Sequence, residues 1–177
     1  MPEMLAAASD RIRDETETLP TLPRYAHHQF TVEPPSDVDG MVARITTADS
    51  LAAALSGADL VIEAVREDLE TKRALFAEMS RLAPTAILAT NSSSIPSSLI
   101  ASAAADPGRV LNTHFFAPIW SRPMPESMSC GGTRREVIDR AQEFGRSLGL
   151  VVAVVNGDSK GFIINRGWRA VKREALR

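Results

Sequence analysis

The sequence predicts an α/β fold built on a parallel sheet. Short apolar runs with strand composition recur between residues 58 and 156, and segments with helical periodicity lie between them. Strands that alternate with helices form βαβ units, in which the strands run parallel. The helices are therefore expected to flank the faces of a parallel sheet.

Before residue 58 the pattern is less regular. Residues 4–19 repeat apolar side chains at helical spacing among charges, which predicts a surface helix. Residues 20–40 are rich in proline and polar residues and are expected to form an irregular loop. The segment VARITT (42–47) has strand composition, and Asp49 is the expected cap of a short helix that follows it.

From residue 58 onward, strands and helices follow in regular order. The run ADLVIEAV is continuous and apolar, as in a strand that is buried on both faces. The expected elements are strands over 58–65, 85–91, 109–116 and 150–156, and helices over 67–83, 95–105, 135–149 and 160–177. Ligands of parallel sheets bind beyond the carboxyl ends of the strands, so a site is expected at the loops after Val65, Asn91 and Phe116.

Composition and charge exclude several classes of partner. The 177-residue chain is 44% hydrophobic and 24% charged, which suits one soluble globular domain. Its formal net charge of −2 gives no reason to expect nucleic acid or an anionic membrane as a partner. Cys130 is the only cysteine, so no internal disulfide can form, and no apolar run reaches the ~18 residues of a membrane helix. Because the first residues become charged too early for a signal peptide, a cytoplasmic location is expected.

The segment LATNSSSI (88–95) raises the first question of function, because three serines follow an apolar strand. A serine at a helix start accepts hydrogen bonds from free backbone amides, and Pro96 suits the first turn. Helix capping explains the serines locally, and contact of one hydroxyl with a substrate is the alternative.

His114 lies among apolar residues in LNTHFFAP, where a histidine is either a satisfied core residue or a catalytic base. Glu126 follows twelve positions later (126 − 114 = 12) and can reach it if the chain turns back after Pro118. A carboxylate bonded to one imidazole nitrogen fixes the tautomer and raises the basicity of the other nitrogen. Without that contact, Glu126 is a solvated loop carboxylate.

Four other features have simple interpretations. Asn165 stands among apolar neighbours in GFIINR, where an amide most simply bonds to the backbone at a helix start. Glu67 and Lys72, five positions apart (72 − 67 = 5), are most simply a pair on the surface of a helix. His27 and His28 have no other histidine or cysteine nearby, so no metal site is expected. No G-x-G-x-x-G occurs, so the glycine turn that binds a dinucleotide pyrophosphate is absent from this sequence.

Together, these segments resemble the 3-hydroxyacyl-CoA dehydrogenase family, which includes bacterial 3-hydroxybutyryl-CoA dehydrogenases. The matching segments are DLVIEAVREDLETK, ILATNSSSIP, RVLNTHFFAP, the region of Glu126 and GFIINR, in the family's order over about residues 42–170. The resemblance implies an oxidoreductase of fatty acid metabolism with a Rossmann-like fold. Such an enzyme uses NAD to oxidise the 3-hydroxyl group of an acyl-CoA substrate to a ketone, reversibly. The resemblance leaves a homo-oligomer open.

The same resemblance assigns roles to individual residues. The catalytic positions are His114 as the base, Glu126 as the carboxylate that orients it, Ser93 as the hydroxyl that bonds the substrate oxygen, and Asn165 as the amide that holds the reacting end. The cofactor-contacting positions are Glu67, Lys72, Asn91 and Ser93. On this interpretation Ser92 and Ser94 serve only the backbone.

The sequence departs from the family pattern at both ends. It lacks the first βαβ unit with its glycine turn, and it stops at Arg177 within the first helix of the C-terminal helical domain. The expected domains are residues 1–160, a partial NAD-binding domain, and residues 161–177, the start of the helical domain. Ala117 replaces the usual asparagine of HFFNP, and Pro125 replaces an apolar strand residue. Without the glycine turn, the cofactor loses charge-assisted phosphate contacts that contribute ~1.5–3 kcal/mol each, so we expect weak activity or none. The alternative is an inactive remnant that binds a partner without cofactor.

Overall fold

The computed structural model describes residues 10, 14, 37–119, 122–155 and 157–176 of the chain. The chain divides into two compact units, residues 1–54 and 55–177, and each is described by itself. The domain boundary expected at residue 160 stays a prediction. Within the described ranges, no helix has the length and apolar character needed to cross a membrane.

α2 (Val38–Ala43) occupies part of the segment expected to be loop and strand. Its first turn is closed by Asp37, whose Oδ1 accepts a hydrogen bond of 2.7 Å from the amide of Gly40. Residues 44–47 form no strand, so the strand expected over 42–47 is wrong, and the loop does not extend to residue 40. The capped turn satisfies the backbone locally, and this outweighs the weak strand preference of a few β-branched residues.

α3 (Leu51–Leu55) follows, and its first turn is capped by Ser50 rather than Asp49. The Ser50 hydroxyl accepts a hydrogen bond of 3.2 Å from the amide of Ala53, so the expected cap is wrong by one residue. The helix expected over 4–19 lies almost entirely outside the described residues.

The second unit is built on a five-stranded sheet in the order β1-β2-β3-β4-β5. Its strands are β1 (Leu60–Glu63), β2 (Ile87–Thr90), β3 (Val110–His114), β4 (Glu126–Ser129) and β5 (Ala153–Val155). The first three strands are parallel, β4 is antiparallel to β3, and β5 is parallel to β4. The fold is therefore Rossmann-like, with a mixed sheet in place of the wholly parallel one expected.

β4 is the strand that the sequence did not predict. Its residues ESMS contain no apolar run, so this segment resembles a loop in sequence. A strand parallel to β3 would need a connection of a dozen or more residues, usually a helix. No helix is described between His114 and Glu126. β4 instead turns back beside β3, which is the reversal after Pro118 that the sequence left open.

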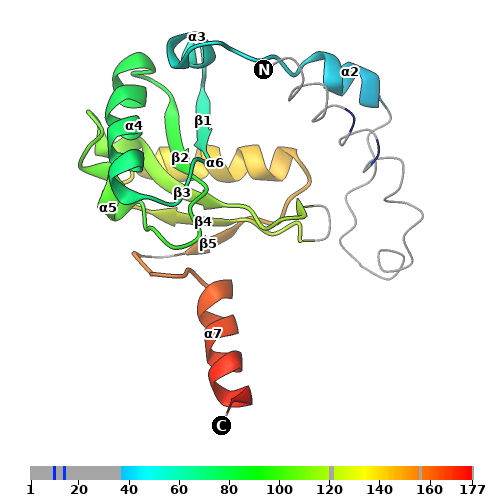
Figure 1. Cartoon of the computed structure of the whole chain (residues 1–177), viewed down its shortest axis with the longest axis vertical. Coiled ribbons are helices and arrows are strands. Elements are labelled where there is room, and N and C mark those ends of the chain that lie inside the picture. Colours follow the sequence, from blue (N-terminus) through cyan, green and yellow to red (C-terminus); the bar gives the residue numbers. More distant parts are fainter. Residues whose placement is uncertain (1–9, 11–13, 15–36, 120–121, 156, 177) are drawn as a thin grey trace. The chain divides into compact units, whose positions relative to one another are not determined.

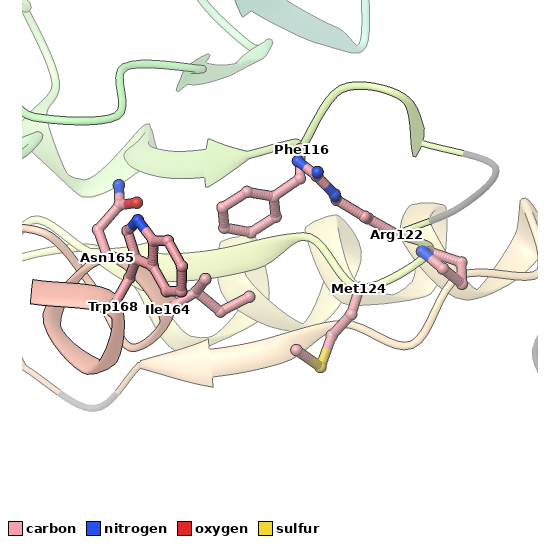
Figure 2. A pocket seen from close by; sticks show the side chains of 7 residues that line it. Phe116, Arg122, Met124, Ile164, Asn165 and Trp168 are labelled. Atoms are coloured by element: carbon pink, nitrogen blue, oxygen red, sulfur yellow. The ribbon is translucent and has the colours of Figure 1, made fainter. Parts of the chain in front are cut away.

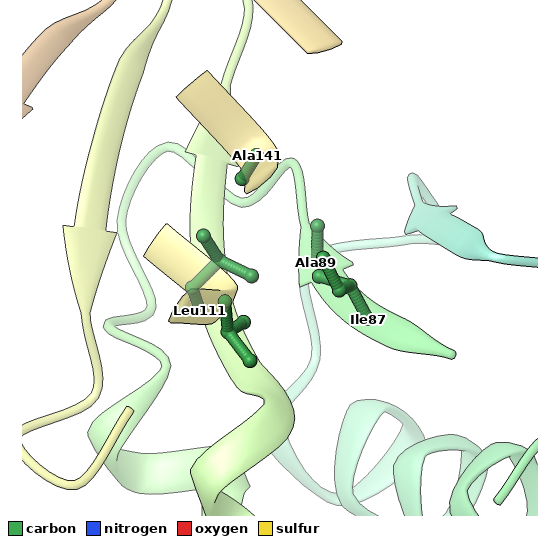
Figure 3. Close-up of a cluster of buried hydrophobic side chains, with 5 residues drawn as sticks. Ile87, Ala89, Leu111 and Ala141 are labelled. Atoms are coloured by element: carbon green, nitrogen blue, oxygen red, sulfur yellow. The ribbon is translucent and has the colours of Figure 1, made fainter. Parts of the chain in front are cut away.

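Helices cover the sheet (Figure 1). α6 (Arg135–Ser147) packs on one face, where its Val137 and Ala141 join a buried cluster with the strand residues Ile87, Ala89 and Leu111 (Figure 3). Gly145 lets α6 pack closely against Val152, because a Cβ atom at position 145 would clash with Cγ2 of that valine.

The neighbours of Leu111 along β3 point to the opposite face, since successive strand side chains alternate. There, Asn112 Oδ1 accepts a hydrogen bond of 2.6 Å from the amide of Ser97, just before α5 (Ser98–Ala101). α5 packs against α4 (Leu69–Leu82). The remaining helices are the 3-10 turn η2 (Pro107–Arg109) and α7 (Ile164–Ala175), which buries none of its residues.

β1 is less buried than the sequence predicts. Ile62 is 39% exposed and Val65, just after the strand, is 41% exposed, whereas every residue of β2 is buried. β1 forms the edge of the described sheet, so fewer elements cover it. The expectation that the strand over 58–65 is buried on both faces is therefore wrong.

Candidate functional site

The loops that follow β1, β2 and β3 meet at one edge of the sheet. The Glu67 Oε1 atom accepts hydrogen bonds from the Ser92 hydroxyl at 2.5 Å and from the Ser94 hydroxyl at 2.7 Å. The Asn91 Oδ1 atom accepts one from the amide of Phe115 at 2.8 Å. The three loops therefore lie together at one polar edge, and the ligand site expected there stays a prediction.

Glu67 is held in its ionised form by these contacts. Partial burial acts to raise the pKa of Glu67, but the hydrogen bonds from Ser92 and Ser94 and the charge of Lys72 together outweigh burial. The pKa of Glu67 therefore lies below its ordinary value. The ionised carboxylate also orders the turn formed by Ser92, Ser93 and Ser94, which is called the serine turn below.

Lys72 is buried, not part of a surface pair. Its side chain is 1% exposed, and its Nζ lies 2.6 Å from Oε1 of the buried Glu63 and 3.5 Å from Oε2 of Glu67. The two remaining contacts of the Glu63 carboxylate come from the Thr90 hydroxyl at 2.7 Å and the amide of Val65 at 2.6 Å. The surface interpretation of Lys72 is wrong because it overlooked a partner nine residues upstream (72 − 63 = 9).

The sequence did hold a signal for this pair. Glu63 interrupts the apolar run LVIEAV, and a charge inside a buried strand requires a partner of opposite sign. Lys72 follows on the next helix, where few other cations face inward. Glu63 is thus the main residue of the site that the sequence reasoning missed.

The hydroxyl groups of the three serines differ in their hydrogen-bond partners. The Ser92 hydroxyl accepts a hydrogen bond of 2.8 Å from the amide of Ile95, which is a cap-like contact before α5. Ser94 is tied to Glu67. Ser93 is exposed, and its hydroxyl has no partner among the described residues. Its carbonyl oxygen accepts a hydrogen bond of 3.3 Å from Nδ2 of Asn165, so residues 72 positions apart are brought together.

His114 and Glu126 form a buried pair across β3 and β4. They are direct partners in the antiparallel register, and Nδ1 of His114 lies 3.2 Å from Oε2 of Glu126. The other carboxylate oxygen accepts hydrogen bonds from the amides of Ile163 and Ile164, both at 2.8 Å. Because the carboxylate can only accept from Nδ1, the neutral imidazole carries its proton there and leaves Nε2 as the basic nitrogen.

The turn before α7 aims these amides at Glu126. Phe162 adopts a positive φ of 50°, which is rare for a residue with a side chain, and the preceding Gly161 has a φ of 86°. Phe162 also stacks on the imidazole of His114, with 5.2 Å between ring centroids. The carboxylate therefore occupies the positive end of α7, where free amides favour an anion.

A pocket of about 610 Å³ adjoins this pair (Figure 2). It is lined by Phe116, Arg122, Pro123, Met124, Ile164, Asn165 and Trp168. The Phe116 ring meets the His114 ring edge-on, with 4.3 Å between centroids. Asn165, which bonds to Ser93, lines the same pocket. Two lining residues thus connect the pocket to the other candidate positions, Asn165 to Ser93 and Phe116 to His114.

The described residues contain no group of histidine, cysteine, aspartate and glutamate side chains that could hold a metal ion. A mostly parallel sheet, with a serine turn and a buried histidine–glutamate pair near its strand ends, defines a Rossmann-like α/β protein. Residues 2–159 match the family model described as 3-hydroxyacyl-CoA dehydrogenase, NAD binding domain. This match covers most of the chain, and the chain therefore belongs to that family.

Relatives with known names agree with this family. The chain is 40% identical over 113 residues to a 3-hydroxybutyryl-CoA dehydrogenase of Mycobacterium tuberculosis, covering 63% of this chain and 40% of the relative. It is 40% identical over 125 residues to a 3-hydroxyadipyl-CoA dehydrogenase of Escherichia coli K12, covering 70% of this chain and 26% of the relative. The crystal structure of a 3-hydroxybutyryl-CoA dehydrogenase from Escherichia coli K12 superposes with a TM-score of 0.76 at 31% identity, over 98% of this chain and 37% of that one. The chain thus spans less than half the length of these relatives.

Proposed function

We propose that the protein is an NAD-dependent 3-hydroxyacyl-CoA dehydrogenase of fatty acid metabolism. It would oxidise the 3-hydroxyl group of an acyl-CoA to a ketone, or run the reverse reduction. The observation that carries the proposal is the pairing of Nδ1 of His114 with Oε2 of Glu126 at 3.2 Å, next to the exposed Ser93 turn. The names of the relatives support acyl-CoA as the substrate class.

The residues present fit part of the cofactor. Glu67 and Asn91 place a carboxylate and an amide at the carboxyl ends of β1 and β2, where such sheets bind nucleotides. Because Oδ1 of Asn91 is held by Phe115, its Nδ2 is left to donate. Lys72 is buried, so its support for the cofactor would pass through Glu67. The sequence holds no glycine turn for the pyrophosphate of the cofactor.

In this proposal, residues of the chain itself transfer the proton. A bound NAD would supply the acceptor for the hydride that leaves carbon 3 of the substrate. Nε2 of His114 takes the proton of the 3-hydroxyl group, because Nδ1 is already bonded to Glu126. The imidazolium that results lies beside an ionised carboxylate, whose second oxygen is fixed by two backbone amides. In the reduction, the same nitrogen returns the proton to the forming alkoxide.

Ser93 and Asn165 orient the substrate in this proposal. The Ser93 hydroxyl donates a hydrogen bond to the 3-oxygen, which strengthens as negative charge develops there. Asn165 is held against the Ser93 carbonyl and presents its amide oxygen to the reacting end of the acyl group. We place the protein in the cytoplasm, in line with its single cysteine, without a nucleic acid or membrane partner.

The test measures NADH oxidation by the chain with acetoacetyl-CoA. A positioned base contributes about 10²–10⁴-fold, so His114→Ala should lower the rate by that factor while NADH binding is kept. Ser127→Ala is the matched control, because it removes from β4 a buried hydroxyl that has no partner among the described residues. A rate that His114→Ala leaves unchanged would contradict the proposal.

The second candidate is a non-catalytic protein that binds a partner without cofactor. The missing pyrophosphate turn favours it. On that hypothesis the chain neither oxidises NADH nor binds it in a fluorescence titration. Saturable NADH binding at micromolar concentration would exclude it.

A further inference from the structure

The pocket beside His114 has walls of two kinds. One wall is the link between β3 and β4, which supplies Phe116 and the run Arg122, Pro123 and Met124. The other is the first turns of α7, where Ile164, Asn165 and Trp168 lie. In Figure 2, Asn165 and Trp168 lie on one side of Phe116, and the Arg122 side chain lies on the other. A chain that starts at the reacting carbon beside Asn165 and passes Phe116 therefore approaches Arg122.

The lining of this pocket is apolar except for one amide and one cation. Phe116, Met124, Ile164 and Trp168 provide rings, a thioether and a branched chain, which suit an acyl chain. Arg122 is the one charged residue among the described lining residues. An uncharged acyl chain has no hydrogen-bond acceptor at its far end for a guanidinium group to bind.

Most N–H donors of the Arg122 guanidinium have no described hydrogen-bond partner. A guanidinium carries five N–H donors, and one hydrogen bond is described here, from Nη1 to the carbonyl oxygen of Ala117 at 3.0 Å. No carboxylate among the described residues pairs with it, in contrast to Arg134 and Arg135, each of which has an acidic partner. The bond to Ala117 holds the guanidinium at the pocket while leaving most of its donors to a ligand.

We propose that Arg122 selects acyl groups whose far end carries a carboxylate. The reacting end would lie at Ser93, His114 and Asn165, the methylene chain against Phe116 and Trp168, and the terminal carboxylate on the Arg122 fork. Arginine is suited to this task because its planar fork matches the two oxygens of a carboxylate. This inference rests on the proposed function for the direction of the acyl chain, and it adds the chemical class of the chain's end.

The test compares the binding of adipyl-CoA and hexanoyl-CoA by isothermal titration calorimetry. The two ligands have six-carbon acyl chains and differ only at the terminal carbon, and neither has a 3-oxygen, so no turnover is needed. Adipyl-CoA should bind about 10-fold more tightly, the size of one partly exposed charge-assisted contact. Arg122→Met should abolish this preference and leave hexanoyl-CoA binding unchanged, and Arg122→Lys should keep part of it.

Arg169→Met is the matched control, since it removes an exposed cation from α7 without touching the pocket lining. It should leave the preference intact. Equal affinity for the two ligands, absence of binding by both, or a preference that survives Arg122→Met would overturn the inference. The proposed function is judged separately by NADH oxidation, because that assay with acetoacetyl-CoA uses a substrate without a terminal carboxylate.

Discussion

Two buried glutamates, one in β1 and one in β4, each take part in three hydrogen bonds but have different partners. Glu63 at the end of β1 is bonded by Lys72, by the Thr90 hydroxyl and by the amide of Val65. Glu126 at the start of β4 is bonded by His114 and by two amides at the start of α7. Both carboxylates are shielded from solvent, since their side chains are 0% exposed.

The difference lies in whether the partner has a free atom that can accept a proton. The lysine ammonium carries only donors, so its pair with Glu63 serves to fix structure. The imidazole has a second nitrogen, Nε2, besides the one bonded to Glu126, so this pair can take up and return a proton in the proposed reaction. The molecule thus contains one static pair, Glu63 with Lys72, and one switchable pair, His114 with Glu126.

The largest effect should come from breaking the static pair. Lys72→Met keeps the length of the side chain but leaves Glu63 as a buried charge without a cation. Removal of one partner of a buried pair costs about 3–5 kcal/mol, so the free energy of unfolding should fall by that amount in urea denaturation. His114→Gln should cost less, because Glu126 keeps its two amide donors.

The double variant Glu63→Gln/Lys72→Met tests whether the loss comes from the uncompensated charge. Replacing both partners removes the charge that would be stranded, so most of the stability should return. If the double variant is as unstable as Lys72→Met alone, the loss does not come from the uncompensated charge of Glu63.

The sequence predicted the first three strands and their helices, because apolar periodicity is a local property. It also brought together Ser93, His114 and Asn165 through the resemblance, and the contact of His114 with Glu126 through the reversal after Pro118. It did not predict β4, since the strand ESMS is stabilised by its neighbours rather than by its own side chains. The Glu63 pair was missed for a related reason, because burial of Lys72 depends on how α4 packs and not on the periodicity of the helix.

The next effect concerns the switchable pair. Glu126→Gln keeps the shape of the side chain but removes the charge that stabilises the imidazolium and fixes the tautomer of His114. The rate of acetoacetyl-CoA reduction should fall about 10²-fold, the lower part of what a positioned base contributes. The free energy of unfolding should change less than for Lys72→Met, since a glutamine oxygen can still accept from the two amides. An unchanged rate would show that Glu126 plays no part in proton transfer.

The smallest effect separates Glu67 from both pairs. The pKa of Glu67 lies below its ordinary value of 4.5, because the Ser92 and Ser94 hydrogen bonds and Lys72 outweigh the opposing effect of burial. A carboxylate whose pKa is lower in the folded chain stabilises the fold above its unfolded pKa, and this contribution is lost as the pH falls through the folded value.

Glu67→Gln should thus lower the stability at neutral pH by less than about 1 kcal/mol, because the side chain is 38% exposed and partly screened. In urea unfolding followed over pH, the difference from the native chain should be constant near neutrality and shrink below about 4.5. A difference that persists unchanged into acid would mean that the charge of Glu67 does not hold the serine turn.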